Sequence, residues 1–134
     1  MKKKVGFLLA AGIILCVLAG QAQAETIYIK IKNFNFYPPD PVINVGDTVI
    51  WENTMNYGHW VISGVDMHHD NKFFSYLLLK GTKFSYTFRE PGDYPYYCPI
   101  HSMQAMISVV DPNAGKAKKG EGSGSAPTKR RRRH

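Results

Sequence analysis

A chain of 134 residues is long enough for one domain with a single hydrophobic core. Its formal net charge of +7 is spread unevenly, because residues 25–112 carry six Lys and Arg against nine Asp and Glu, whereas residues 113–134 carry eight against one. The part able to fold is therefore acidic, so the basic total does not indicate nucleic-acid binding.

The first 24 residues have the pattern of an export signal. Residues 2–4 are lysines, residues 5–19 form an apolar run too short for a comfortable membrane span, and residues 22–24 (Ala-Gln-Ala) form a small-x-small cleavage site. An uncleaved anchor, or a lipoprotein modified at Cys16, is the alternative, but Leu15 is too large for a good lipobox. We expect residues 1–24 to be removed on export to a bacterial periplasm.

The remaining chain alternates apolar and polar residues in short runs, which is typical of half-buried strands. The expected strands are residues 26–32, 42–45, 48–53, 59–63, 84–88, 94–98 and 107–110. Turn signals such as Gly46-Asp47 and Pro91-Gly92 separate them, and only residues 73–79 suit a short helical turn. Residues 25–112 are thus predicted to form an all-β domain, a Greek-key antiparallel β-sandwich.

The composition changes abruptly after Pro112. Residues 116–125 are rich in Gly, Lys and Ser, and residues 129–133 are an unbroken basic run. With almost nothing apolar to bury, residues 113–134 are expected to be a disordered polybasic tail. The tail is either simply solvated or attracted to an acidic partner protein or an anionic membrane surface.

A group of possible metal ligands follows the strand at 94–98. Cys98 is the only cysteine left once Cys16 has been removed, and His101 comes three residues later. Met103 and Met106 follow within the same short stretch, and His59 lies well upstream. A cysteine, two histidines and a weakly bound methionine are the ligands of a trigonal blue-copper electron-transfer site, so the sequence predicts one copper ion there.

A second cluster, Met67-His68-His69-Asp70, has less to support it. Adjacent histidines point to opposite sides of an extended chain, so they do not easily bind one ion together. We interpret the cluster as a surface loop, with an accessory copper-capture site as the alternative.

The order of these features resembles the small cupredoxins, the plastocyanin, amicyanin and pseudoazurin group. The matching motifs are Phe34-x-Phe36-x-Pro38, Val45-Gly46-Asp47-Thr48-Val49-x-Trp51-x-Asn53, His59-x-Val61, Phe84-x-Tyr86-x-Phe88, Pro91-Gly92-x-Tyr94-x-Tyr96-Tyr97-Cys98 and Cys98-x-x-His101. The resemblance implies a cupredoxin-like sandwich with one type 1 copper ion. It also implies that His59, Cys98 and His101 are the equatorial copper ligands.

The resemblance leaves the axial methionine open. Met106 gives a Cys98-to-methionine spacing similar to plastocyanins and pseudoazurins. Met103 begins a stretch similar to the family's final strand, and it would share a face with Ala105 and Ile107. Both remain candidates for the axial ligand, with Met106 placed first and Met103 as the alternative.

Taken together, the sequence predicts a periplasmic one-electron carrier rather than an enzyme. Copper enzymes such as nitrite reductases need further copper sites, and a chain with five histidines does not supply them. Outer-sphere transfer through His101 to redox partners in weak, transient complexes is the expected mechanism, and we expect a monomer. The alternative is a copper storage or delivery protein that uses the same site.

Overall fold

The structure is a computed structural model that describes residues 23–115, and within that range it contains strands and turns but no helix. The strands are β1 (Thr26–Lys32), β2 (Asn35–Tyr37), β3 (Val42–Asn44), β4 (Thr48–Asn53), β5 (Ile62–Val65), β6 (His68–Phe74), β7 (Lys83–Thr87), β8 (Gly92–Cys98) and β9 (Met103–Val110). Nothing in the described range could therefore cross a membrane as a helix.

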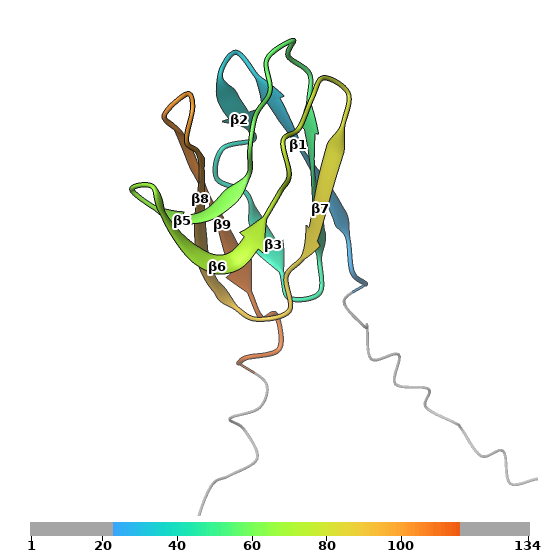
Figure 1. Ribbon diagram of the computed structural model, residues 1–134. Coiled ribbons are helices and arrows are strands. Elements are labelled where there is room, and N and C mark those ends of the chain that lie inside the picture. Colours follow the sequence, from blue (N-terminus) through green and yellow to red (C-terminus); the bar gives the residue numbers. More distant parts are fainter. Residues whose placement is uncertain (1–22, 116–134) are drawn as a thin grey trace, which may run out of the picture.

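The nine strands form two sheets that face each other (Figure 1). One sheet has the order β2-β1-β4-β7 and the other has the order β3-β9-β8-β5-β6. This arrangement confirms the predicted all-β sandwich. It also corrects one detail, because β1 pairs with β4 and β3 pairs with β9 in parallel, whereas the other pairs are antiparallel.

The core lies between the sheets and is unusually aromatic. Trp51 is fully buried and its ring stacks on Phe84 at 5.5 Å and meets Tyr96 edge-on at 5.6 Å. Alternating apolar positions supply the rest, as β1 shows by burying Ile29 and Ile31 completely while its lysines face solvent. Burial of such large rings contributes most of the stabilisation, and it makes a stiff platform for the loops at either end.

The buried carboxylate of Asp47 binds the backbone at the start of the described domain. Asp47 is 2% exposed, and its two oxygens accept hydrogen bonds from the backbone nitrogens of Glu25 at 2.8 Å and Asn44 at 2.7 Å. The Thr48 nitrogen in turn donates to the Glu25 carbonyl at 2.9 Å. These bonds set the register in which β1 enters the sheet.

Several strand limits differ from the predicted ones. β5 begins at Ile62 rather than residue 59, and β9 begins at Met103 rather than residue 107. The interpretation of residues 67–70 as a surface loop is wrong, because His68–Phe74 forms the edge strand β6 after a two-residue turn. Residues 73–79 hold no helical turn. The predicted signal at 1–24 and the tail at 113–134 lie almost wholly outside the described residues.

The two ends of the sandwich carry different features. The β1–β2 and β8–β9 turns lie at the upper end in Figure 1, and the described segment begins and ends at the lower end. The β8–β9 turn carries His101, so the predicted metal ligands lie at the end of the domain opposite to both chain ends.

Candidate metal centre

His59 lies outside the named strands, but an isolated antiparallel bridge to Leu78 holds its backbone. Its nitrogen donates to the Leu78 carbonyl at 3.1 Å, and its carbonyl accepts from the Leu78 nitrogen at 2.8 Å. The preceding loop is fixed by Asn53, whose buried amide nitrogen donates to the carbonyls of Tyr57 and Leu78 and whose oxygen accepts from the Met55 nitrogen. The His59 side chain is consequently fully buried.

Cys98 and His101 come from the connection between β8 and β9. Cys98 is the last residue of β8, lies directly opposite Met103 in the strand pairing, and is fully buried. A four-residue turn, residues 99–102, joins the two strands, and Ser102 adopts a positive φ of 51° within it. His101 sits in this turn and is half-buried, so it is the outermost of the three candidate ligands.

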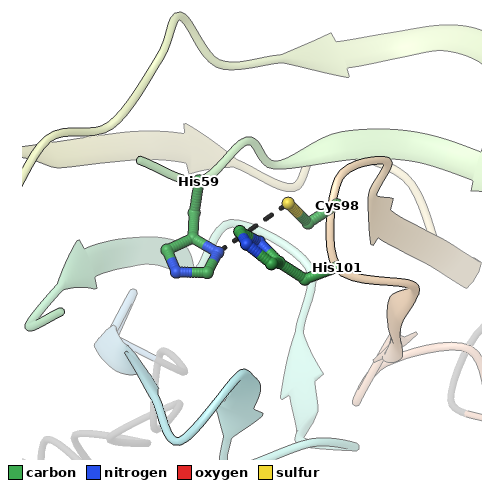
Figure 2. A group of neighbouring side chains, drawn as sticks. All are labelled: His59, Cys98 and His101. Atoms are coloured by element: carbon green, nitrogen blue, oxygen red, sulfur yellow. Dashed lines mark hydrogen bonds between the residues drawn. The ribbon is translucent and has the colours of Figure 1, made fainter. Parts of the chain in front are cut away.

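The three side chains converge on one point, as Figure 2 shows. Cys98 Sγ lies 3.8 Å from His59 Nδ1. One donor atom from each of His59, Cys98 and His101 lies within 4.8 Å of the others, and this is the one such group of possible metal-binding side chains among residues 23–115. Segments 39 residues apart therefore meet at a single cluster of soft donors.

The unused hydrogen-bonding capacity of His101 fits a metal ion. His101 Nδ1 is buried and has no hydrogen-bond partner among the described residues. His59 Nδ1 faces Cys98 Sγ at 3.8 Å, and the other nitrogen of that ring points away from the cluster (Figure 2). A buried nitrogen with a lone pair and no partner is costly unless something binds it. Thiolate and imidazole are donors that copper prefers, so the cluster has the chemistry to hold copper.

Burial also keeps His59 in the form that binds metals. The pKa of His59 is lowered from its ordinary value, first because burial disfavours the imidazolium form and second because His101 lies beside it. Near neutral pH the His59 ring is therefore uncharged, and its Nδ1, which faces Cys98, can donate a lone pair to a metal ion.

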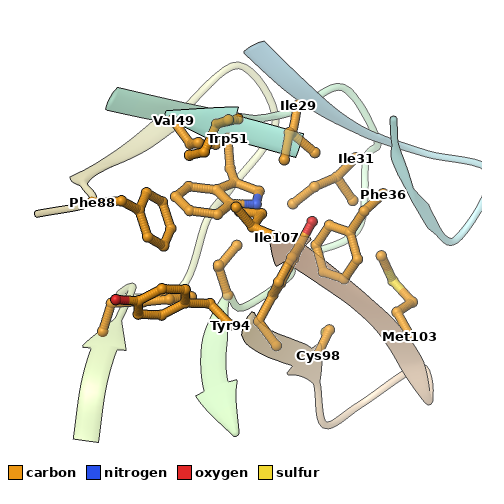
Figure 3. Close-up of a cluster of buried hydrophobic side chains, with 14 of the residues drawn as sticks. Ile29, Ile31, Phe36, Val49, Trp51, Phe88, Tyr94, Cys98, Met103 and Ile107 are labelled. Carbon is orange, nitrogen blue, oxygen red and sulfur yellow. The ribbon is translucent and has the colours of Figure 1, made fainter. Parts of the chain in front are cut away.

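The two candidate methionines lie on opposite faces of β9. Met103 is 3% exposed and shares the inward face with Ile107 and Val109. Figure 3 shows Met103 and Cys98 at the same end of the buried cluster, with Val49 and Phe88 at the other end. Met106 is 38% exposed, faces outward and pairs with Pro95 on β8.

Aromatic rings that the sequence prediction did not assign to the site surround the imidazoles. The Phe34 ring lies 5.0 Å from the His101 ring and 6.0 Å from the His59 ring, measured between centroids. Tyr57 lies 5.6 Å from Phe34 and 6.5 Å from His101. Both rings are substantially exposed and come from turns, so the period-two pattern of the strands gave no signal for them.

The second histidine cluster does not assemble. His68 and His69 are neighbours on the edge strand β6, and each makes a separate contact: His68 Nδ1 bonds to the Asp66 carbonyl at 2.8 Å, and the His69 ring packs near Phe74. These contacts separate the two imidazoles, so residues 67–70 form no metal-binding group within the described range.

Comparison with known proteins agrees with the fold and the donor set. The family model for copper binding proteins of the plastocyanin/azurin family matches residues 23–111. A chloroplastic plastocyanin of Hordeum vulgare is 32% identical over 114 residues, which cover 78% of this chain and 72% of that protein. An amicyanin of Paracoccus versutus is 27% identical, covering 71% of this chain and 72% of that protein.

Solved structures extend the likeness to the backbone. A purple cupredoxin from Nitrosopumilus maritimus superimposes with a TM-score of 0.58 at 29% identity, covering 63% of this chain and 99% of that chain. A copper-containing nitrite reductase from Thermus scotoductus also gives 0.58 at 28% identity, covering 65% of this chain, but the match covers only 23% of that enzyme. The chain belongs to the plastocyanin/azurin family of copper-binding proteins.

Proposed function

We propose that this protein is a one-electron carrier whose copper ion is held by His59, Cys98 and His101, with Met103 as the axial ligand. The observation that carries the proposal is the buried meeting of one thiol and two imidazoles, with donor atoms within 4.8 Å. Met103 is preferred to Met106 because it is buried, lies opposite Cys98 in the strand pairing and faces inward. Copper bound there supplies the Cu(I)/Cu(II) couple.

The surrounding protein supports a carrier because it holds the donors still. His59 is clamped by two backbone bonds to Leu78, and Cys98 ends a strand that is paired on both sides. Donors that cannot move keep one geometry in both oxidation states, which lowers the reorganisation needed for transfer. A storage or delivery protein needs exchangeable copper, and complete burial of Cys98 and His59 favours the carrier instead.

His101 is the proposed route for the electron. It is the only one of the three ligands that is not fully buried, and its turn also carries Ile100, which is 56% exposed. An exposed imidazole edge beside apolar side chains suits a small, weak encounter with a redox partner. The plastocyanin and amicyanin relatives match over most of their length and support a carrier rather than an enzyme. The match to the nitrite reductase covers only part of that chain.

The test is to add Cu(II) to the protein and to the variant His101→Gly. We expect the protein to give an intense blue thiolate-to-copper band and fast reduction and oxidation by small inorganic reagents. The variant should fold with an unchanged far-UV spectrum but exchange electrons far more slowly, because its exit ligand is missing. Equal rates in the two proteins would contradict the role of His101, and a colourless copper adduct of the unaltered protein would contradict the copper assignment.

Location and docking belong to the same proposal. The charged start, apolar run and Ala-Gln-Ala site support export to the periplasm with cleavage before Glu25. Strand β9 ends at the end of the sandwich opposite His101, and the basic residues of 113–134 that follow it in the sequence would attract an acidic partner or an anionic membrane. Deleting residues 113–134 should flatten the ionic-strength dependence of partner reduction, whereas an unchanged dependence would remove the tail from docking.

A further inference from the structure

The turn between β1 and β2 has a strained backbone. Lys32 pairs with Asn35, so the connection is only Asn33-Phe34, and these residues have φ values of 50° and 54°. Two positive φ values in a two-residue hairpin define a type I′ turn, in which Gly is strongly preferred at the second position. Phe34 occupies that position although its Cβ is crowded in the left-handed region.

Hydrophobic burial does not explain why Phe34 is there, since its side chain remains 43% exposed. What the turn achieves is contact: it lays the Phe34 ring against the His101 ring, at 5.0 Å and 51°, and within 6.0 Å of the His59 ring. The Phe34 nitrogen also donates to Met55 Sδ at 3.4 Å, which ties the turn to the loop that leads to His59. Residues held in sparsely populated backbone conformations often lie at functional sites.

His101 needs an external restraint. A metal-binding histidine usually donates its other ring N–H to a carboxylate or carbonyl, and that bond fixes the ring. His101 Nδ1 is buried without a partner and is the nitrogen left for the metal, no carboxylate or carbonyl within 23–115 accepts a bond from the rest of the ring, and His101 itself lies in a four-residue turn. Its orientation therefore depends on packing against the neighbouring rings, of which Phe34 is the nearest aromatic residue outside the ligand set.

We propose that Phe34 is a positioning residue, which replaces the missing hydrogen bond and holds the His101 imidazole in one orientation in both oxidation states. This inference rests on the proposed function, because it assigns a role to the packing around a proposed ligand. It makes the strain of the β1–β2 turn part of the site: a glycine would suit the backbone better but would leave His101 free to turn.

The chain contains a matched control in its other type I′ turn. Asp66-Met67 joins β5 to β6 with φ values of 48° and 65°, and Met67 occupies the position equivalent to Phe34. Met67 is 46% exposed, close to the exposure of Phe34, and lies in the β5–β6 turn, which is separate from the β8–β9 turn that carries His101 (Figure 1). Met67→Gly therefore relieves the same type of strain without touching His101.

The experiment compares the unaltered protein with Phe34→Gly, Phe34→Tyr and Met67→Gly. In the metal-free proteins, both glycine variants should melt at the same temperature or a few degrees higher, up to about 5 °C, because strain is relieved. The NMR signals of the His101 ring should lose their ring-current shift and indicate averaging between orientations in Phe34→Gly alone. In the copper-loaded proteins, loss of Cu(I) to a chelator should accelerate about tenfold in Phe34→Gly.

Phe34→Tyr should restore both the His101 signals and the slow Cu(I) loss, and Met67→Gly should leave both unchanged. A His101 ring that stays fixed in Phe34→Gly would overturn the proposal, as would a variant that slows only the reaction with a protein partner, since that result marks a docking contact. The metal-free NMR result does not depend on copper, so failure of the copper assignment would appear separately, as a missing blue band in the unaltered protein.

Discussion

Two pairs of histidines in this molecule behave in opposite ways. His59 and His101 come from distant segments, yet their ring centroids lie 4.6 Å apart. His68 and His69 are adjacent in sequence, yet the strand β6 sends them to separate contacts. Adjacent residues of a strand point to opposite faces of the sheet, so their side chains lie apart. The fold, in contrast, can bring together side chains from distant loops. The pair made by the fold, rather than by the sequence, has the geometry to bind copper.

The largest expected effect comes from removing the Cys98 thiol, which lies with His59 and His101 in the donor cluster. Cys98→Ser keeps the size of the side chain but replaces the soft donor with a hydroxyl, so we expect the intense blue band to disappear completely. Visible and EPR spectra after addition of Cu(II) measure this directly. A variant that kept the band would show that another residue supplies the sulfur.

A smaller change should distinguish the two faces of β9. Met103→Leu is expected to shift the reduction potential and the visible spectrum, because we place its thioether beside the copper ligands. Met106→Leu is the matched control, since the substitution is the same and its side chain faces outward at 38% exposure. Both variants should lose less than about 1.5 kcal/mol of stability, because the substitution conserves volume. The opposite pattern of shifts would make Met106 the axial ligand.

Acid should weaken the metal-free protein through His59. Its pKa is lowered in the folded state by burial and by His101, while the unfolded chain has the ordinary value of 6.5. As the pH falls through 6.5, the unfolded chain gains a proton that the folded chain does not take up, so the free energy of unfolding decreases. Melting temperatures between pH 7 and pH 5 should fall for the metal-free protein and fall less for His59→Asn. Equal slopes would assign the acid sensitivity to other groups.

The smallest expected effect tests the second pair. The double variant His68→Asn, His69→Asn should bind one copper ion per chain with an unchanged spectrum, since these rings make separate contacts on an edge strand. Copper titration followed by metal analysis measures the stoichiometry. A second equivalent of copper that binds the unaltered protein and is lost in this variant would establish an accessory site at residues 67–70.

The sequence carried much of the fold because strand alternation is a local signal. The alternation over residues 26–32 predicts a strand with one buried face, and Ile29 and Ile31 on that face are fully buried. The parallel pairing of β1 with β4 could not be predicted, since a strand has the same period of two whichever way its neighbour runs. Strand β6 was missed for a related reason: its residues before Phe73 are all exposed, so an edge strand looked like a polar loop.

The sequence predicts the metal ligands of the site from their donor chemistry, but it does not predict the contacts that depend on turn conformation. Cys98 and His101 stand out by spacing alone, and the inward face of β9 favoured Met103 as one alternative. Phe34 belongs to a motif shared with the cupredoxins, but its position beside His101 follows from a strained turn that a phenylalanine rarely occupies. The role of Asn53 in fixing the loop before His59 leaves no signal in the sequence, because its amide nitrogen donates to backbone carbonyls rather than to a recognisable partner side chain.

The bond between Glu25 and Asp47 has a consequence for the maturation of the chain. The predicted cleavage falls between Ala24 and Glu25, and the Glu25 nitrogen lies 2.8 Å from an oxygen of the buried Asp47 carboxylate. Cleavage there would turn the neutral amide donor into an ammonium group, which would add the attraction between opposite charges to a hydrogen bond that the carboxylate already accepts. A chain acetylated at Glu25 should accordingly melt below the free one, and an equal melting temperature would refute this. Cleavage by the signal peptidase would then also raise the free energy of unfolding, so the precursor would be less stable than the mature protein.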